Sequence, residues 1–214
     1  PDFYLKFTQG KLLYYLEKEP FYLFLQNYQE QNRWVRQQDL DISLEAESAL
    51  VDALDLNSLP ENKYYKYDFL FNNCSTQQRD LLMKSLGASL NFDRYQAPVE
   101  TFRDMIDRYM AYDEWTDLGI DLLLGLPCDA EASNQERMFL PDELMTAIDS
   151  ATINGKPLVK NSRMLFTSMP SPSGFKAGPA LFVWLIFFIL ILQQVRGKRA
   201  TQARGIGFTY FFIT

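Results

Sequence analysis

The sequence predicts an α+β domain of ordinary size followed by a transmembrane helix, and three observations lead to this prediction. The chain has 214 residues, of which 47% are hydrophobic, so it is long and apolar enough to bury a core. Before residue 167, segments with the period-two pattern of strands alternate with segments of helical periodicity. After that domain, residues 177–192 form a stretch without a charged side chain.

Three elements are expected near the start of the chain. Residues 11–19, KLLYYLEKE, have the aromatic and aliphatic content of a strand. Residues 20–32 open with Pro20, which suits the first position of a helix. Residues 33–42, RWVRQQDLDI, fit a second strand.

A better marked helix follows in residues 43–60. Ser43 can cap it, and acidic residues in its first turn favour the positive end of the helix dipole. Its apolar face repeats at helical spacing and contains Ala46, Ala49, Leu50, Ala53 and Leu54. We expect this helix to end near Asn57.

The stretch KYYKYDFLFNNCSTQQRDLLMKSLG changes from a strand pattern to a helix pattern. Tyr65, Tyr67 and Phe69 alternate along a predicted strand. Residues 72–73 are two asparagines, which are favoured helix caps, and Gly87 is a natural stop. Cys74 is therefore predicted in the first turn of a helix that follows a strand.

Two more helices are expected before the linker. Residues 98–110 place four apolar side chains at helical spacing, namely Phe102, Met105, Ile106 and Tyr109, and residues 140–151 form a helix after Pro141. Residues 167–176 have the Ser, Pro and Gly content of a linker. The sequence contains no internal repeat, glycine-rich phosphate loop or metal-ligand spacing, so we predict neither a metal nor a cofactor.

The charge of −6 is unevenly distributed. From residue 176 onward the chain has five basic residues and no acidic one, which leaves 16 basic against 27 acidic residues, or −11, in the domain before it. Nucleic-acid binding requires basic side chains that neutralise phosphates, so an acidic domain argues against it.

Residues 177–195 are the predicted membrane span. Nineteen helical residues extend about 28 Å, close to the hydrocarbon thickness of a bilayer. Residues 196–205 are basic and are expected as a cytoplasmic loop, which places the acidic domain on the opposite, periplasmic side. Residues 206–214 resemble the start of a second span. The chain begins at Pro1 without a signal-like stretch, so we expect an exporting segment upstream.

Cys74 has two interpretations from the residues alone. At a helix N-terminus, backbone amides favour a thiolate and can stabilise an oxyanion, as in papain-like enzymes. The alternative is a buried structural cysteine, because cysteines often pack in cores. A disulfide with Cys128 is also conceivable in an oxidising compartment, but it would consume the thiol.

A resemblance favours the first interpretation. The segment YDFLFNNCSTQQRDLL, with FYLKFTQGKLLYYL, YQEQNRWVRQQDLDIS, TFRDMID, WTDLGIDLLLGLPCD and ERMFLPDEL, resembles the Lnb N-terminal periplasmic domain family of Gram-negative bacteria. The resemblance covers most of residues 1–166. It implies a papain-like cysteine acyltransferase, circularly permuted and incomplete at its N-terminus, with Cys74 as nucleophile. Asn73, Arg79 and Asp80 are its implied neighbours, as substrate-binding or site-orienting residues.

The family pattern also has an upstream histidine, whereas this sequence contains none. We attribute the absence to truncation; a degenerate, inactive homologue is the competing explanation. A thiol mechanism needs such a partner to accept and return the proton. Arg79 and Asp80 can equally form a surface ion pair, and the tyrosines of residues 64–67 can line an acyl groove or simply pack.

The resulting functional expectation is a protein of the bacterial inner membrane with its N-terminal domain in the periplasm. Membrane lipid would donate the acyl chain and a lipoprotein amine would accept it, through an acyl-thioester on Cys74. A papain-like peptidase or amidase acting on peptide or cell-wall substrate is one alternative. A catalytically inactive binding module is the other. The residues do not indicate an oligomeric state.

Overall fold

The computed structural model describes residues 6–7, 9–110, 113–168 and 178–210, with side chains in the last range through Gln194. The chain divides into two compact units. One comprises Pro1–Ile106 and Leu123–Ser171, and the other comprises Asp107–Leu122 and Pro172–Thr214. The first unit mixes helices with short strands, which confirms the predicted α+β class.

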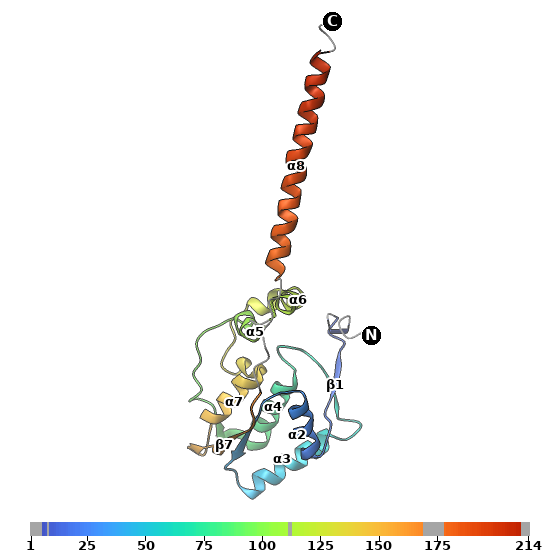
Figure 1. Ribbon diagram of the computed structural model, residues 1–214. Helices are drawn as coiled ribbons and strands as arrows, with labels where there is room; N and C mark the ends of the chain where they lie inside the picture. The colour runs from blue at the N-terminus through green and yellow to red at the C-terminus, as the bar shows by residue number, and fades with distance from the viewer. Residues whose placement is uncertain (1–5, 8, 111–112, 169–177, 211–214) are drawn as a thin grey trace. The chain divides into compact units, whose positions relative to one another are not determined.

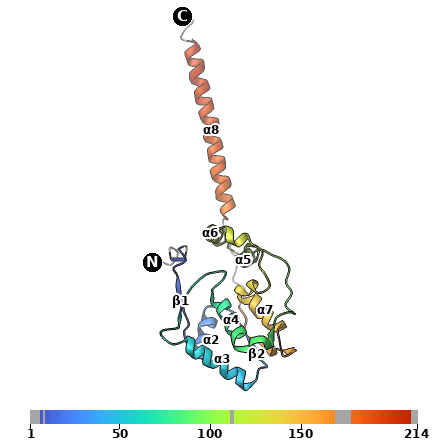
Figure 2. The same ribbon diagram turned by 180° about the vertical axis from the view of Figure 1, so that it is seen from behind.

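The helices of the first unit are packed around α4. In Figures 1 and 2, α4 (Cys74–Leu86) is flanked by α2 (Phe21–Glu30) and α3 (Leu44–Asn57) on one side and by α7 (Pro141–Ser150) on the other. The 3-10 turn η3 (Glu136–Phe139) also contacts α4. The helix that carries Cys74 is therefore held in place from two sides.

The described strands form three small antiparallel sheets. β1 (Leu13–Tyr15) pairs with β3 (Tyr64–Lys66), and β2 (Val35–Leu40) pairs with β7 (Val159–Phe166). The third sheet has the order β4-β5-β6 and is built from very short strands: β4 (Leu90–Asn91), β5 (Thr152–Ile153) and β6 (Lys156–Pro157). The pairing of β1 with β3 matters for the site because it brings residues 13–15 next to the segment that leads into α4.

The hydrophobic core lies between α4, α7 and the segments beside them. Its buried residues are Leu86, Tyr95, Met138, Leu144, Ala147, Ile148, Ala151 and Leu158. From α3, Ala46 and Leu50 pack against this cluster, as the predicted apolar face requires. Leu54 of the same face is instead 39% exposed.

Several predicted elements need correction. The strand expected through Phe69 ends at Lys66, because Asp68 turns the chain there. Of the four side chains at helical spacing on α5 (Phe102–Met110), Phe102, Met105 and Ile106 are buried, whereas Tyr109 is 41% exposed. β7, the longest described strand, was not predicted, because its residues alternate poorly between apolar and polar.

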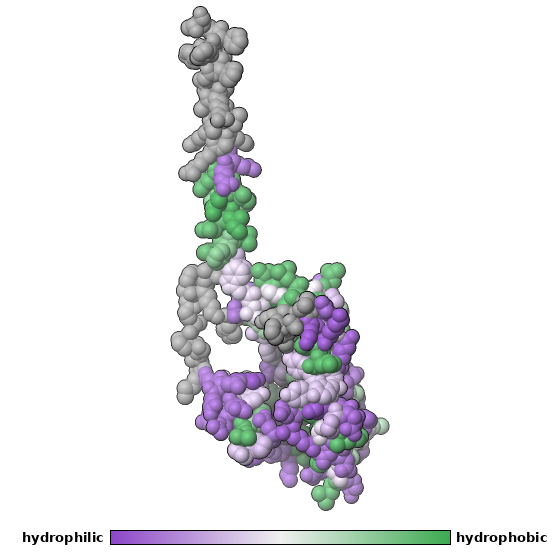
Figure 3. Space-filling view, turned by 90° about the vertical axis from the view of Figure 1, so that its right-hand side faces the viewer, coloured by the Kyte–Doolittle hydropathy of each residue, from purple (hydrophilic) through white to green (hydrophobic). Residues whose placement is uncertain are grey.

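In the second unit, α6 (Glu114–Leu124) was not expected, and α8 runs without a break over Pro179–Tyr210. The loop predicted at residues 196–205 is therefore helical; these residues include no proline to interrupt the hydrogen-bond pattern. The predicted linker at residues 167–176 lies almost entirely outside the described residues. On the face that Figure 3 presents, apolar side chains cover most of the part of α8 whose side chains are described, and hydrophilic ones lie at its far end.

Within the part of the chain that the structure describes, no helix combines the length and the apolar character needed to cross a membrane.

Candidate active site

A compact turn joins β3 to α4 and fixes where α4 begins. The Asp68 carboxylate accepts hydrogen bonds from the backbone N–H groups of Leu70 (3.0 Å) and Phe71 (2.9 Å). The backbones of Asp68 and Asn72 bond to each other in both directions. An Asx-type turn of this kind ends the strand and delivers the next residue, Asn73, to the helix cap.

Asn73 is the N-cap of α4 and is only 5% exposed. Its Oδ1 accepts from the N–H groups of Ser75 (2.9 Å) and Thr76 (3.0 Å), and the Thr76 hydroxyl accepts from the Asn73 N–H. Its Nδ2 donates to the carbonyls of Phe69 (2.8 Å) and Phe139 (2.9 Å). Asn73 therefore ties the start of α4 to the preceding turn and to η3, which suits a site-orienting role.

Cys74 is the first residue of α4, and its side chain is exposed with a free thiol. Cys74 and Cys128 do not form a disulfide, and Cys128 is buried at 1% exposure. The cap uses the N–H groups of Ser75 and Thr76, whereas the Cys74 N–H has no acceptor among the described residues. One backbone donor thus remains beside the thiol.

A pocket of about 240 Å³ opens beside Cys74. One wall is a face of α4, because residues three, four and seven positions after Cys74 lie on the same side of a helix. The other walls come from the β1 and β3 ends and the end of α3. The lining residues are Tyr15, Leu16, Glu17, Leu54, Asn57, Asn62, Lys63, Tyr65, Cys74, Gln77, Gln78 and Leu81.

Tyr15 of β1 and Tyr65 of β3 line the pocket with Cys74, and Tyr67 follows β3 directly. The rings of Tyr14 and Tyr67 stack with centroids 4.3 Å apart, and Tyr65 lies opposite Tyr14 in the sheet register. Burial raises the pKa of Tyr65, and negative charge on Cys74 raises it further. The pKa of Tyr67 is raised more strongly, mainly by burial. Both phenols are therefore neutral hydrogen-bond donors near Cys74 at neutral pH.

Arg79 and Asp80 do not line the Cys74 pocket. Arg79 points away from the Cys74 face of α4. Its Nε donates a hydrogen bond to Asp80 (2.7 Å), and its Nη1 donates one to the Gln135 carbonyl (2.9 Å). It lines a separate hollow with Glu136. Hydrogen bonds from Ser133 lower the pKa of Glu136, and the Arg79 charge contributes. In this position Arg79 anchors the segment before η3. The ion pair with Asp80 is present, but Arg79 is buried at 8% exposure, so the pair differs from the surface pair considered from the sequence.

Sequence reasoning missed most of the residues that share the pocket with Cys74. Helical spacing from Cys74 identifies Gln77, Gln78 and Leu81 as pocket residues. Glu17 and Lys63 line the pocket only because β1 pairs with β3, which the sequence does not reveal. The chain has no histidine, so the titratable residues that line the pocket are Tyr15, Glu17, Lys63, Tyr65 and Cys74. At the start of α4 the arrangement brings together a thiol and a backbone N–H group, the two kinds of group that nucleophilic attack on a carbonyl requires.

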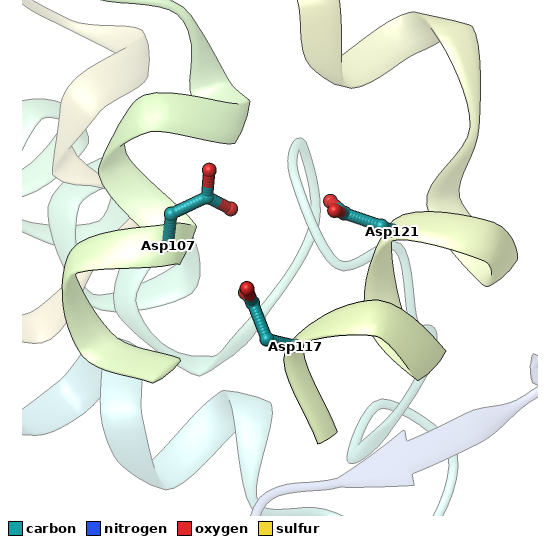
Figure 4. A group of neighbouring side chains, drawn as sticks. All are labelled: Asp107, Asp117 and Asp121. Carbon is teal, nitrogen blue, oxygen red and sulfur yellow. The ribbon is translucent and has the colours of Figure 1, made fainter. Parts of the chain in front are cut away.

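A separate acidic cluster lies in the second unit. Asp107 of α5 and Asp117 and Asp121 of α6 can each offer one oxygen, with all three oxygens within 4.8 Å of one another. Figure 4 shows the three carboxylates directed toward a common space. Carboxylate oxygens are the ligands that hard divalent cations prefer. Acidic clusters are common without a metal, and this one alone does not define a site.

The family comparison covers the segment that forms the site. The model of the Lnb N-terminal periplasmic domain matches residues 2–108, half of the chain, and so includes Cys74 and every lining residue of its pocket. The match ends well before residue 166, where the sequence predicted the end of the domain. No curated protein and no solved structure gives a significant match. On the family match, the chain belongs to the Lnb N-terminal periplasmic domain family.

Proposed function

We propose that the chain is part of a membrane-anchored cysteine acyltransferase that forms an acyl-thioester on Cys74. Membrane lipid is the acyl donor, and the N-terminal amine of a lipoprotein is the acceptor. The observation that supports this proposal best is the position of an exposed, free thiol at the start of α4, beside a pocket with both apolar and polar lining. Neither a buried core cysteine nor a disulfide fits this position.

The proposed reaction has two steps. The Cys74 thiolate attacks an ester carbonyl of the lipid, the C–O bond breaks, and the lipid alcohol leaves with a proton. The acceptor amine then attacks the thioester, an amide forms, and the thiol is regenerated. The free N–H of Cys74 can donate to the oxyanion formed in each step. The thiol proton needs an acceptor, and the family resemblance implies a histidine in this role.

The circularly permuted papain-like fold is part of the same proposal. Its support is local: Cys74 begins a helix that follows a strand, and the tyrosines of two paired strands lie beside it. This placement is the one in which papain-like enzymes present their nucleophile. The small sheets of the first unit are consistent with an α+β domain and do not by themselves identify the papain-like topology.

We also propose that residues 177–195 anchor the domain in the inner membrane. Support comes from the absence of charged residues over 177–192, from the exposed apolar side chains of α8 between Leu181 and Leu192, and from the basic residues that follow. In a Cys74→Ala background, a cysteine introduced at Ser171 should react with an impermeant reagent outside intact cells. A cysteine introduced at Thr201 should not, and the reverse pattern would refute this topology.

The mechanism is tested with the full-length protein and lipoprotein N-acylation as readout. Cys74→Ala should abolish acyl transfer while the protein stays folded, and Cys74→Ser should lose most of it because a hydroxyl is far less acidic than a thiol. Cys128→Ala is the matched control, since it removes the second cysteine of the chain, which does not line the pocket. Undiminished N-acylation by folded Cys74→Ala would eliminate the proposal.

The exposure of Cys74 is the observation that supports the hydrolase alternative, because water can also reach a thioester there. A peptide-cleavage product without an acyl adduct would assign the protein to the papain-like hydrolases. Absence of both activities from the unsubstituted full-length protein would favour a binding module.

A further inference from the structure

The pocket beside Cys74 contains two opposite charges that do not pair with each other. Glu17 follows β1 and Lys63 precedes β3, and the backbone N–H of Leu16 donates to the Lys63 carbonyl (2.9 Å), so the two segments are adjacent. Among the described residues, no carboxylate lies within 4.0 Å of the Lys63 ammonium. Both charges are therefore available to a ligand.

Two aromatic rings hold the Lys63 ammonium in position. It lies 5.3 Å from the ring centroid of Tyr15 and 5.2 Å from that of Tyr64. Cation–π contacts of this length restrict a long side chain without neutralising its charge. Lys63 is thus a partly buried, positioned cation, whereas Glu17 on the neighbouring segment is exposed.

The size of the pocket limits what it can take. At about 240 Å³ it is smaller than the roughly 300–1,000 Å³ of sites that enclose a drug-sized ligand. A lipid with two acyl chains cannot be enclosed, but a headgroup with the first carbons of a chain can. Leu16, Leu54 and Leu81 supply apolar surface for those carbons.

We propose that this pocket recognises the acyl donor through a zwitterionic headgroup, with its phosphate at Lys63 and its primary ammonium at Glu17. A single ligand that carries both charges satisfies both side chains. An anionic lipid without the ammonium would place its phosphate near the Glu17 carboxylate, which repels it. The specificity assignment rests on the proposed acyltransferase function, because only then is the lipid a substrate.

The test measures binding without chemistry. Purified full chain carrying Cys74→Ala is titrated calorimetrically with monomeric short-chain phospholipids, dihexanoylphosphatidylethanolamine and dihexanoylphosphatidylglycerol. We expect the ethanolamine lipid to bind about tenfold more tightly than the glycerol lipid, because its ammonium adds one charge-assisted hydrogen bond. Glu17→Gln should remove this preference, and Lys63→Gln should weaken both lipids about tenfold while Lys63→Arg retains binding.

Two matched variants control for a general loss of charge. Glu19 and Lys66 are exposed, lie within three residues of Glu17 and Lys63, and do not line the pocket. Glu19→Gln and Lys66→Gln should bind both lipids as the parent does. Circular dichroism of every variant establishes that the fold is retained.

Equal affinity for the two lipids, or unchanged binding in both Glu17→Gln and Lys63→Gln, would overturn the headgroup assignment. Because no thioester can form in the Cys74→Ala background, this result does not depend on the acyl-transfer mechanism. An acyl adduct on Cys74 without headgroup preference would leave the proposed function standing and refute the pocket assignment. A headgroup preference in a protein that forms no adduct would refute the proposed function and leave the pocket assignment standing.

Discussion

Replacing Asn73 by alanine should destabilise the first unit by about 3 kcal/mol. The substitution removes the helix cap, in which the Asn73 side chain accepts hydrogen bonds from the N–H groups of Ser75 and Thr76. This loss costs about 1 kcal/mol. The carbonyls of Phe69 and Phe139 also lose their donor, and each unsatisfied buried group adds at least about 1 kcal/mol. Asn73→Asp keeps the cap acceptor but cannot donate to the two carbonyls, so it should still cost about 2 kcal/mol or more.

Urea unfolding followed by circular dichroism gives these differences as shifts in the free energy of unfolding. Asn72→Ala is the matched control. Asn72 donates to the Lys66 carbonyl and accepts from Gln77 from a more exposed position, so its loss should cost about 1 kcal/mol. If Asn73→Ala cost no more than Asn72→Ala, the buried cap would not hold α4 in place, and the reasoning about how Cys74 is positioned would fail.

Three further predictions follow from buried or exposed groups. Arg137→Met should destabilise the protein by about 3–5 kcal/mol in urea unfolding, because it removes the 2%-exposed guanidinium that pairs with Glu100 and Glu143; a change below 1 kcal/mol would refute a structural role. Burial and the hydrogen bond to Glu143 raise the pKa of Tyr95 to about 12. The free energy of unfolding should therefore fall by about 2 kcal/mol as pH rises from 10 to 12, and Tyr95→Phe should flatten this dependence. In the native protein, a thiol reagent should modify Cys74 rapidly and Cys128 only after unfolding, and equal rates would contradict their different burial.

Local signals in the sequence predicted the elements that carry the site. Ser43 caps α3 as expected, its side chain accepting from the Ala46 N–H, and Pro141 begins α7. The change from period two to helical periodicity placed Cys74 at the start of α4 correctly. Each of these features depends on neighbours within one or two turns, which is why the sequence reveals them.

The rest of the site depends on contacts between distant segments. Glu17 joins the pocket only because β1 pairs with β3, and the short pairing leaves no strong alternation in the sequence to predict it. Arg79 was grouped with Cys74 because the two share a motif. Five positions along a helix turn a side chain through more than a third of a circle, so Arg79 faces Gln135 and not the pocket.

Mass spectrometry of the Cys74 peptide tests the central claim most directly. The full-length protein is incubated with phospholipid vesicles, digested, and compared with and without hydroxylamine, which cleaves thioesters. We predict a fatty-acyl mass on the peptide that contains Cys74, its loss after hydroxylamine, and no such mass on the Cys128 peptide. Lipoprotein N-acylation by a protein that never carries this adduct on Cys74 would contradict the proposed mechanism.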